Sequence, residues 1–237
     1  MHYYEEIGCE KRKEINPSQT IFETDEPKPS NKYMKRDGIS DFIFEKAKKQ
    51  YVVSGFTKED IFYYVYGILH SPDYHKTFSN DLKKVLPKIP LVDNLADFKS
   101  FSKAGRKLAD LHLNYETVPP YPDVKVTDTE GEYCTVSKMK FPKKDQKDTI
   151  IYNSKITISG ISDKAYQYIV NGKSAIEWIM ERYQVTTDSD RGITNDSNDW
   201  AKEVGNPRYI LDLLLSIINL SVQTVDIVDE LPELKFE

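Results

Sequence analysis

Two acids followed by a lysine are the first residues in this chain whose types could carry chemistry. Asp73, Asp81 and Lys83 occur in the order used by many metal-dependent nucleases. That chemistry needs both carboxylates on adjacent strands, facing one cation. Here both acids fall in sequence with helical periodicity, which favours an ordinary helical surface. An independent nuclease is therefore kept as a separate hypothesis, without a metal site to support it.

The tetrad Asn206-Pro207-Arg208-Tyr209 differs at its third position from the Asn-Pro-Pro-Tyr motif of adenine-specific DNA methyltransferases. The chain contains no Gly-x-Gly that would form a tight cofactor-binding turn after a strand. Asparagine followed by proline is instead typical of a helix start, with asparagine as the cap and proline at the first helical position. We interpret the tetrad as the beginning of a helix.

The polar segment 186–199 has the outline of a calcium loop, with Asp188, Asp190 and Asp199 at suitable spacing. Gly192 stands one place too early, however, and the bidentate glutamate is missing. The segment therefore predicts a solvated loop. The four histidines and two cysteines show no ligand spacing. We expect no catalytic residue, metal or cofactor site in this chain.

Lysines gather on one segment of the second half. Between Ser137 and Lys155, six lysines are accompanied by only two acids. The flanking residues 133–141 and 149–158 alternate and are rich in β-branched side chains, which predicts two strands joined by a basic loop. Such a pair can enter a DNA groove, although a solvated hairpin is the plain alternative. The six are Lys138, Lys140, Lys143, Lys144, Lys147 and Lys155.

The elements around these residues are predicted by periodicity and by proline breaks. Residues 1–36 indicate one or two short strands and a proline-bearing connector, residues 37–118 a helical subregion, and residues 119–237 a mixed one. We expect one α+β domain, with a helical N-terminal half and a small, mainly antiparallel sheet flanked by helices in the C-terminal half. The predicted helices cover about residues 40–51, 57–69, 74–85, 95–115, 162–168, 174–183 and 207–225.

Composition limits the classes of function. The net charge of −5 gives no general argument for nucleic acid, so DNA binding requires a local basic surface. The apolar segment 209–222 is too short to span a bilayer and carries Asp212, which predicts a buried helix and no membrane partner. Two distant cysteines and no signal peptide favour the cytoplasm. The mixed beginning suggests a segment of a longer protein.

Several phrases, in this order and spacing, resemble the C-terminal region of type ISP restriction–modification enzymes. These are large bacterial single-chain proteins that join a nuclease, a helicase-like ATP motor, an adenine methyltransferase and a target recognition domain. The resemblance covers residues 37–232. Arginine is usual in the family at His75 and Lys88, and serine at Arg191, which bears on the contact residues and not on the family. The phrases are Asp60–Tyr74, Leu86–Pro90, Gly105–Glu116, Lys138–Phe141, Glu177–Val185 and Gly192–Trp200.

The resemblance implies a non-catalytic specificity domain that reads a short asymmetric DNA site for the other domains. Its partners would be double-stranded DNA and the methyltransferase and motor domains of the same polypeptide. S-adenosylmethionine, ATP and Mg²⁺ would serve the whole enzyme outside this chain. A protein-interaction module that couples the methyltransferase to the motor without touching DNA is the alternative.

Specific recognition needs Arg, Lys, Asn or Gln at base edges and further cations at phosphates. We expect the contacts on the predicted hairpin and around the polar loop. The candidates are Lys138, Lys140, Lys143, Lys144, Asn153 and Lys155, followed by Arg182, Arg191, Asn195 and Asn198.

Overall fold

The computed structural model describes residues 2–6, 33–52, 55–127 and 134–235. The chain divides into two compact units, Met1–Phe62 and Tyr63–Glu237. The boundary between the units falls inside helix α2 (Lys58–Ile68). Helices and short antiparallel strands confirm the predicted α+β class and the helical first half. The proline-bearing connector lies outside the described residues.

The first unit begins with a two-stranded antiparallel ribbon. Strand β1 (His2–Glu6) pairs along its whole length with β2 (Tyr33–Asp37), as the sequence predicted for this region. Helix α1 (Asp41–Tyr51) follows, and the Ser40 hydroxyl caps it by accepting the Ile43 amide.

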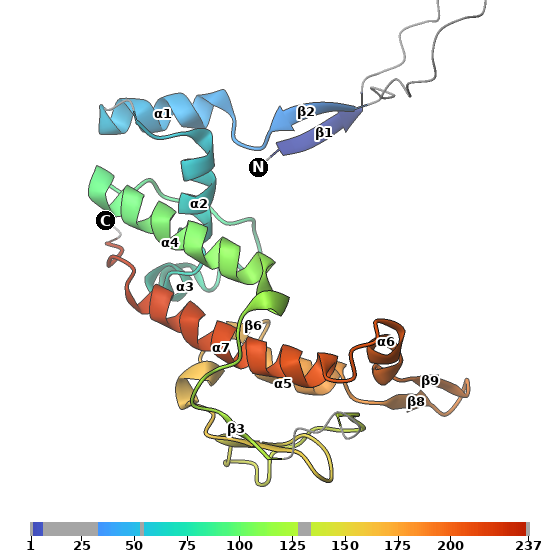
Figure 1. Ribbon diagram of the computed structural model, residues 1–237. Coiled ribbons are helices and arrows are strands. Elements are labelled where there is room, and N and C mark those ends of the chain that lie inside the picture. Colours follow the sequence, from blue (N-terminus) through green and yellow to red (C-terminus); the bar gives the residue numbers. More distant parts are fainter. Residues whose placement is uncertain (1, 7–32, 53–54, 128–133, 236–237) are drawn as a thin grey trace, which may run out of the picture. The chain divides into compact units, whose positions relative to one another are not determined.

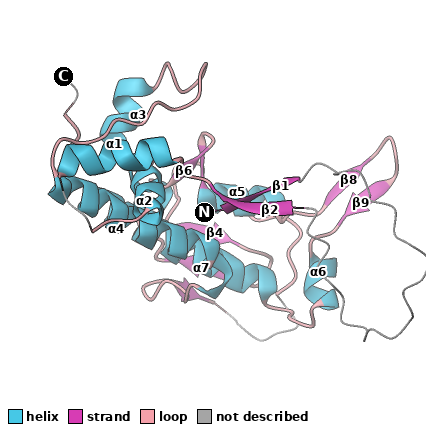
Figure 2. Ribbon diagram, turned by 90° about the horizontal axis from the view of Figure 1, so that it is seen from above, coloured by secondary structure: helices cyan, strands magenta, loops and turns pink. Residues whose placement is uncertain are grey.

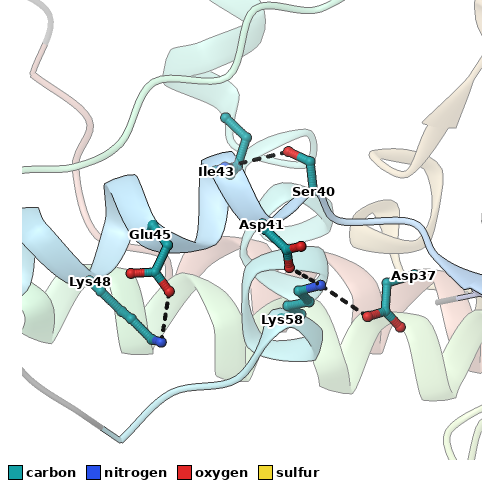
Figure 3. A network of polar contacts seen from close by, with 7 residues as sticks. All are labelled: Asp37, Ser40, Asp41, Ile43, Glu45, Lys48 and Lys58. Carbon is teal, nitrogen blue, oxygen red and sulfur yellow. Dashed lines mark hydrogen bonds and ion pairs between the residues drawn. The ribbon is translucent and has the colours of Figure 1, made fainter.

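A lysine joins the segments around α1 (Figure 3). The Lys58 ammonium group lies 2.7 Å from an Asp41 oxygen and 3.0 Å from an Asp37 oxygen. A second pair, Lys48 with Glu45, runs along the helix at 3.0 Å. Helix α2 starts with a reciprocal cap, because the Thr57 amide donates to Asp60 at 2.8 Å while the Asp60 amide donates to Thr57 at 3.2 Å.

In the second unit, α2 and α4 (Leu95–Leu113) cross at two glycines. A Cβ on Gly105 would lie 1.8 Å from the Tyr63 carbonyl oxygen, and one on Gly67 would lie 2.3 Å from the Phe101 carbonyl oxygen. The two backbones can therefore approach this closely only because neither position carries a side chain.

An aromatic residue of α2 fills the space beside this crossing. The buried Tyr64 ring stacks on Phe98 with centroids 4.8 Å apart. Its hydroxyl donates to the Pro90 carbonyl at 2.6 Å and accepts the Val92 amide at 3.1 Å. Tyr64 is therefore enclosed, with its phenol hydroxyl both donating and accepting a hydrogen bond.

The helix predicted at 74–85 is shorter than expected. Helix α3 (Pro72–Phe78) begins after Ser71, whose hydroxyl accepts the Tyr74 amide, and turns replace the helix from Ser79 to Lys84. The apolar spacing there continues past the end of the helix. It therefore gave a wrong C-terminal boundary.

The predicted pair of long strands is also wrong in detail. Strands β3 (Lys125–Val126), β5 (Thr157–Ser159) and β4 (Thr149–Ile151) form an antiparallel sheet in that order. The stretch 149–158 thus folds back on itself as a tight hairpin. The described part of 133–141 contributes one isolated bridge, between Lys140 and Ile151.

The rest of the second unit alternates short elements. The stretch predicted as a helix at 162–168 is a 3₁₀ helix, η3 (Asp163–Tyr166). The loop predicted at 186–199 contains a strand pair and the start of a helix, which the polar composition did not reveal. The remaining elements are η1 (Tyr115–Thr117), β6 (Ile169–Val170), β7 (Lys173–Ser174), α5 (Ala175–Arg182), β8 (Thr186–Asp188), β9 (Ile193–Asn195) and α6 (Asn198–Glu203).

Helix α7 (Tyr209–Asp229) is the core of the second unit. It starts two residues later than predicted, because Asn206 and Pro207 form a turn before it and Arg208 occupies the cap position. An 18-residue window of this 21-residue helix has a mean hydropathy of 1.6, which meets the length and composition of a membrane span, yet 72% of the window is buried in the fold. Its burial identifies it as a core helix.

The sheet, α5 and α7 share one hydrophobic core. Ile158 of the sheet, Ile176 of α5 and Leu214 of α7 are all fully buried. Figure 1 shows α7 lying between α4 and the sheet, with α5 beside it. Figure 2 shows how short the strands of this unit are compared with its helices. Helices therefore carry most of the packing, and the strands shape its edge.

Candidate nucleic-acid interface

Four lysines present their charges to solvent from one continuous segment. Lys138, Lys140, Lys143 and Lys144 are exposed, and none forms a salt bridge with another described residue. Partners for these ammonium groups must come from outside the described chain or from water. An exposed, unpaired set of cations is the local feature that an acidic chain needs for binding a polyanion.

The backbone under these lysines is fixed by the neighbouring hairpin. Lys140 and Ile151 exchange two backbone hydrogen bonds, of 3.1 and 2.8 Å. The buried Tyr152 hydroxyl donates to the Cys134 carbonyl at 2.7 Å. Burial of Cys134, Val136 and Met139 leaves the intervening side chains outside. The segment 134–141 is therefore irregular, held to β4 by one bridge, with Lys138 and Lys140 in solvent.

Lys147 differs from the other lysines of the basic loop. Its ammonium group lies 2.9 Å from Glu177 and within 6 Å of the Phe141 and Tyr166 rings. Burial alone would raise the pKa of Glu177, but hydrogen bonds from Lys147 and Ser174 hold that pKa below its usual value. Lys147 therefore anchors the loop to α5.

Asn153 and Lys155 lie in the turn between β4 and β5. The Asn153 side-chain oxygen Oδ1 accepts the backbone amides of Lys155 at 2.9 Å and Ile156 at 2.7 Å, and its side-chain nitrogen Nδ2 donates to the Thr135 carbonyl at 2.9 Å. The side chain thus shapes the turn and holds the lysine-bearing segment. Lys155 is exposed beside it.

Asn198 performs a similar task from helix α6. Its side chain is buried, accepts the Val136 amide at 2.9 Å and donates to the Val136 carbonyl at 2.7 Å. It also donates to Asp196 at 2.6 Å. Residue type alone suggested a base contact for Asn153 and Asn198, but both amides make structural bonds in this fold.

The remaining candidates lie on α5 and on the β8–β9 ribbon. Arg182 is exposed at the end of α5, with its guanidinium 5.3 Å from the Trp178 ring centre. Arg191 lies at the ribbon tip, 77% exposed and 3.9 Å from Asp188. Asn195 is exposed on β9, opposite Thr186.

An open groove of about 460 Å³ is lined by three of the ten candidates and by none of Lys138, Lys140, Lys143 and Lys144. Asn153 and Lys155 line it from the β4–β5 turn, and Asn198 lines it from α6. Lys202 of α6 lies in the same lining and pairs with Asp199 at 2.9 Å. Sequence reasoning missed Lys202, because only the fold brings α6 next to the lysine-bearing residues 134–144, called the basic segment below. Arg182, Arg191 and Asn195 are outside the lining.

The residues of the nuclease and methyltransferase hypotheses make structural hydrogen bonds or lie in exposed turns. Asp73 accepts the Leu234 amide at 3.0 Å, and Asp81 is exposed in a turn. Asn206 accepts the Arg208 amide at 3.0 Å. Among residues 2–6, 33–52, 55–127 and 134–235, no three His, Cys, Asp or Glu side chains are grouped to hold a metal ion.

Fold and surface together define the second unit as an α+β module with an unpaired basic segment at its edge. The sequence comparison gives its family. The chain belongs to the Type ISP C-terminal specificity domain family, whose model matches residues 5–213. This confirms the resemblance found in the sequence. None of the curated protein sequences matches the chain significantly.

Three solved structures are similar to the chain. The ATP-dependent Type ISP enzyme LlaBIII bound to DNA is 39% identical over 100% of this chain, with a TM-score of 0.79. A nuclease-deletion mutant of the Type ISP enzyme LlaGI with a DNA substrate mimic is 48% identical over 78% of the chain, with a TM-score of 0.70. The DrdV–DNA complex is 28% identical over 85%, with a TM-score of 0.72. This chain spans only 14%, 17% and 20% of the LlaBIII, LlaGI and DrdV chains, respectively.

Proposed function

We propose that this chain recognises a specific double-stranded DNA sequence for a restriction–modification enzyme. Membership of the Type ISP specificity family over residues 5–213 is the observation that carries the proposal. The related LlaBIII and LlaGI structures contain DNA or a DNA mimic. The basic segment supplies a surface of suitable charge on a chain whose net charge is −5.

The exposed lysines suit phosphate binding. A lysine on a phosphate releases counterions from DNA and orients the protein on the duplex, but it carries no sequence information. Lys138, Lys140, Lys143 and Lys144 would take this role, with Lys155 beside them at the groove. Asn153 and Asn198 would act through the backbone they hold. Arg182, Arg191 and Asn195 complete the proposed contact set.

The role of the natural polypeptide follows from the same proposal. The chain itself would be a non-catalytic specificity domain, formed by residues 1–36, 37–118 and 119–237 together. The family match supports this, because it crosses the boundary between the two units. Adenine methylation and ATP-dependent restriction would belong to other domains of the polypeptide, which would bind S-adenosylmethionine, ATP and Mg²⁺. The expected location is the cytoplasm.

The basic segment is tested by removing two of its charges. Replacing Lys143 and Lys144 by alanine in the natural polypeptide should weaken binding to all duplexes about equally, because phosphates are common to all sequences. The slope of log K against log salt should fall by roughly 1 to 2, as about 0.9 is expected per phosphate contact on duplex DNA. Fluorescence anisotropy over a salt series measures both.

The matched control removes Lys99 and Lys103, two exposed lysines of α4. It should leave the affinity and the salt slope of the natural polypeptide unchanged. If the Lys143/Lys144 variant behaves like this control, the basic segment is not a DNA face. The alternative, a coupling module between methyltransferase and motor, would then explain the chain better.

One observation favours the coupling module, namely an apolar cavity in the second unit. A cavity of about 240 Å³ lies among Tyr74, Phe78 and Leu82, beside the exposed side chains of Val85 and Leu86. Such a surface suits protein contact, and it uses none of the basic segment. Coupling and DNA recognition are therefore compatible roles for different faces.

A further inference from the structure

The β8–β9 ribbon forms although none of its strand residues is buried. All six residues of its two strands are exposed on both faces. An isolated two-stranded ribbon is marginal in water, and strands ordinarily bury at least one face. In both views the ribbon extends away from the elements around it, next to α6 (Figures 1 and 2). Its faces are thus available to a partner.

Both ends of the ribbon are fixed to the lysine-bearing segment. Before β8, the Val185 amide donates to the Ser137 carbonyl at 2.8 Å. After β9, Asn198 exchanges two hydrogen bonds with the Val136 backbone. Two consecutive residues of the basic segment therefore hold both ends of the ribbon. A ligand bound by the neighbouring lysines would meet the ribbon in a fixed direction.

The tip is also held in one shape. The Asp188 carboxylate accepts the amides of Asp190 at 3.0 Å and Arg191 at 3.2 Å, and the Asp188 carbonyl accepts the Gly192 amide at 2.8 Å. Gly192 has φ +65°, which a residue without a side chain adopts at little cost. A hydroxyl pair, Thr187 with Thr194 at 3.0 Å, fixes the register.

From these features we infer that the ribbon is the base-reading element and that its partner is the major groove of duplex DNA, with Arg191 contacting guanine. This inference rests on the proposed function. Arginine binds the O6 and N7 atoms of guanine with two donors, which is the commonest specific contact in that groove. Arg191 is 77% exposed, and its 3.9 Å pairing with Asp188 is loose enough to be exchanged for a base.

The dimensions of the ribbon fit this groove. A two-stranded ribbon is narrow enough for a groove about 12 Å wide. Three residues per strand span roughly 10 Å at about 3.3 Å each, close to the groove depth of about 8.5 Å.

The acidic tip of the ribbon and the basic lysines suit different parts of DNA. Asp188 and Asp190 make the tip unsuitable for the phosphate backbone, where like charges repel. Carboxylates are tolerated at base edges, where they accept hydrogen bonds from cytosine. The tip would therefore read base edges while the exposed lysines hold phosphates.

Arg191→Ala and Arg191→Gln in the natural polypeptide test the inference. Selection from randomised duplexes first gives the preferred site of the unaltered protein, and binding to each single-base variant then gives its discrimination. With Arg191→Ala, discrimination should fall roughly 5- to 150-fold at one G·C pair, since a bidentate pair contributes about that much. The affinity for unrelated DNA should stay the same, and the slope of log K against log salt should change by less than about 1.

Arg191→Gln should move the preference at that position towards A·T, because glutamine pairs with adenine. The exposed Lys103→Ala change on α4 is the control and should alter neither quantity. If both Arg191 variants select the unaltered protein's site with unchanged discrimination, the inference is overturned and the proposed function stands. If the unaltered protein selects no site, the proposed function fails and the inference fails with it.

Discussion

At the scale of single residues, side-chain type predicted which lysines are exposed better than it predicted what the asparagines do. Asn153 and Asn198 were predicted as contact candidates because asparagine can read adenine. In the structure their amides bond to the backbone around Thr135 and Val136. The sequence does not reveal such partners, because they lie 18 and 62 positions away along the chain. The exposure of Lys138, Lys140, Lys143 and Lys144 was easier to predict, since a solvent-facing charge needs no partner within the fold.

A histidine cluster in the second unit also belongs to structure. His112 lies 2.8 Å from the Tyr66 hydroxyl and 2.9 Å from the Thr224 hydroxyl, and its ring stacks on Tyr168. Burial, followed by the neighbouring His70, lowers the pKa of His112 to about 4. Burial likewise lowers the pKa of His70 and raises that of Tyr168 to about 12. The cluster is neutral at pH 7.

Acid should therefore destabilise this unit between about pH 6.5 and pH 4. In that window an unfolded histidine binds a proton and the folded His112 does not, so the unfolded state gains stability as the pH falls. After allowance for solvent screening, the loss is on the order of 2 kcal/mol at pH 4. Urea unfolding at a series of pH values measures it.

His112→Gln should lower the stability at pH 7 and make its decline towards pH 4 shallower. The exposed His75→Gln change is the control and should keep the full decline. An unchanged decline in the His112 variant would show that this histidine is not responsible.

At the scale of elements, local periodicity predicted the longer helices well and missed the end of α3, the 3₁₀ character of η3 and the start of α6. Helix α5 was expected at 174–183 and occupies Ala175–Arg182, because apolar spacing and the Ser174–Glu177 capping box are both local signals. The strands were predicted poorly. Residues 134–141 pair through one bridge at Lys140 and form no regular strand, which periodicity does not reveal. Strands β8 and β9 are exposed throughout, so no apolar alternation marks them in the sequence.

The crossing of α2 and α4 should be intolerant of any side chain at Gly105. The added Cβ of Gly105→Ala would meet the Tyr63 carbonyl oxygen and the Gly67 nitrogen, at 1.8 and 2.8 Å, and backbone atoms cannot move aside as a rotamer can. We expect a loss of about 2 kcal/mol or more in unfolding free energy, measured by chemical denaturation. Lys103→Ala on the exposed face of α4 should change stability by no more than about 0.5 kcal/mol. Equal stability of the two variants would contradict the close approach.

At the scale of the whole molecule, different parts of the second unit have different structural roles. The α7 core holds α5 and the sheet, the sheet positions the basic segment, and that segment fixes the ribbon. The fold class and the family were predictable from sequence, because they depend on helical periodicity and on long distinctive phrases such as Asp60–Tyr74. The groove was not, since it forms between segments distant in the chain.

The most direct measurement exchanges this chain for the matching part of LlaBIII, which is 39% identical to it over the whole of this chain. The natural polypeptide and the exchanged version are each used to select duplexes from a randomised pool, and the bound sites are sequenced. Enrichment of a defined site shows that the exchanged protein folds and binds. We expect its preferred sequence to become that of LlaBIII. Retention of the original preferred sequence after the exchange would show that specificity lies outside this chain.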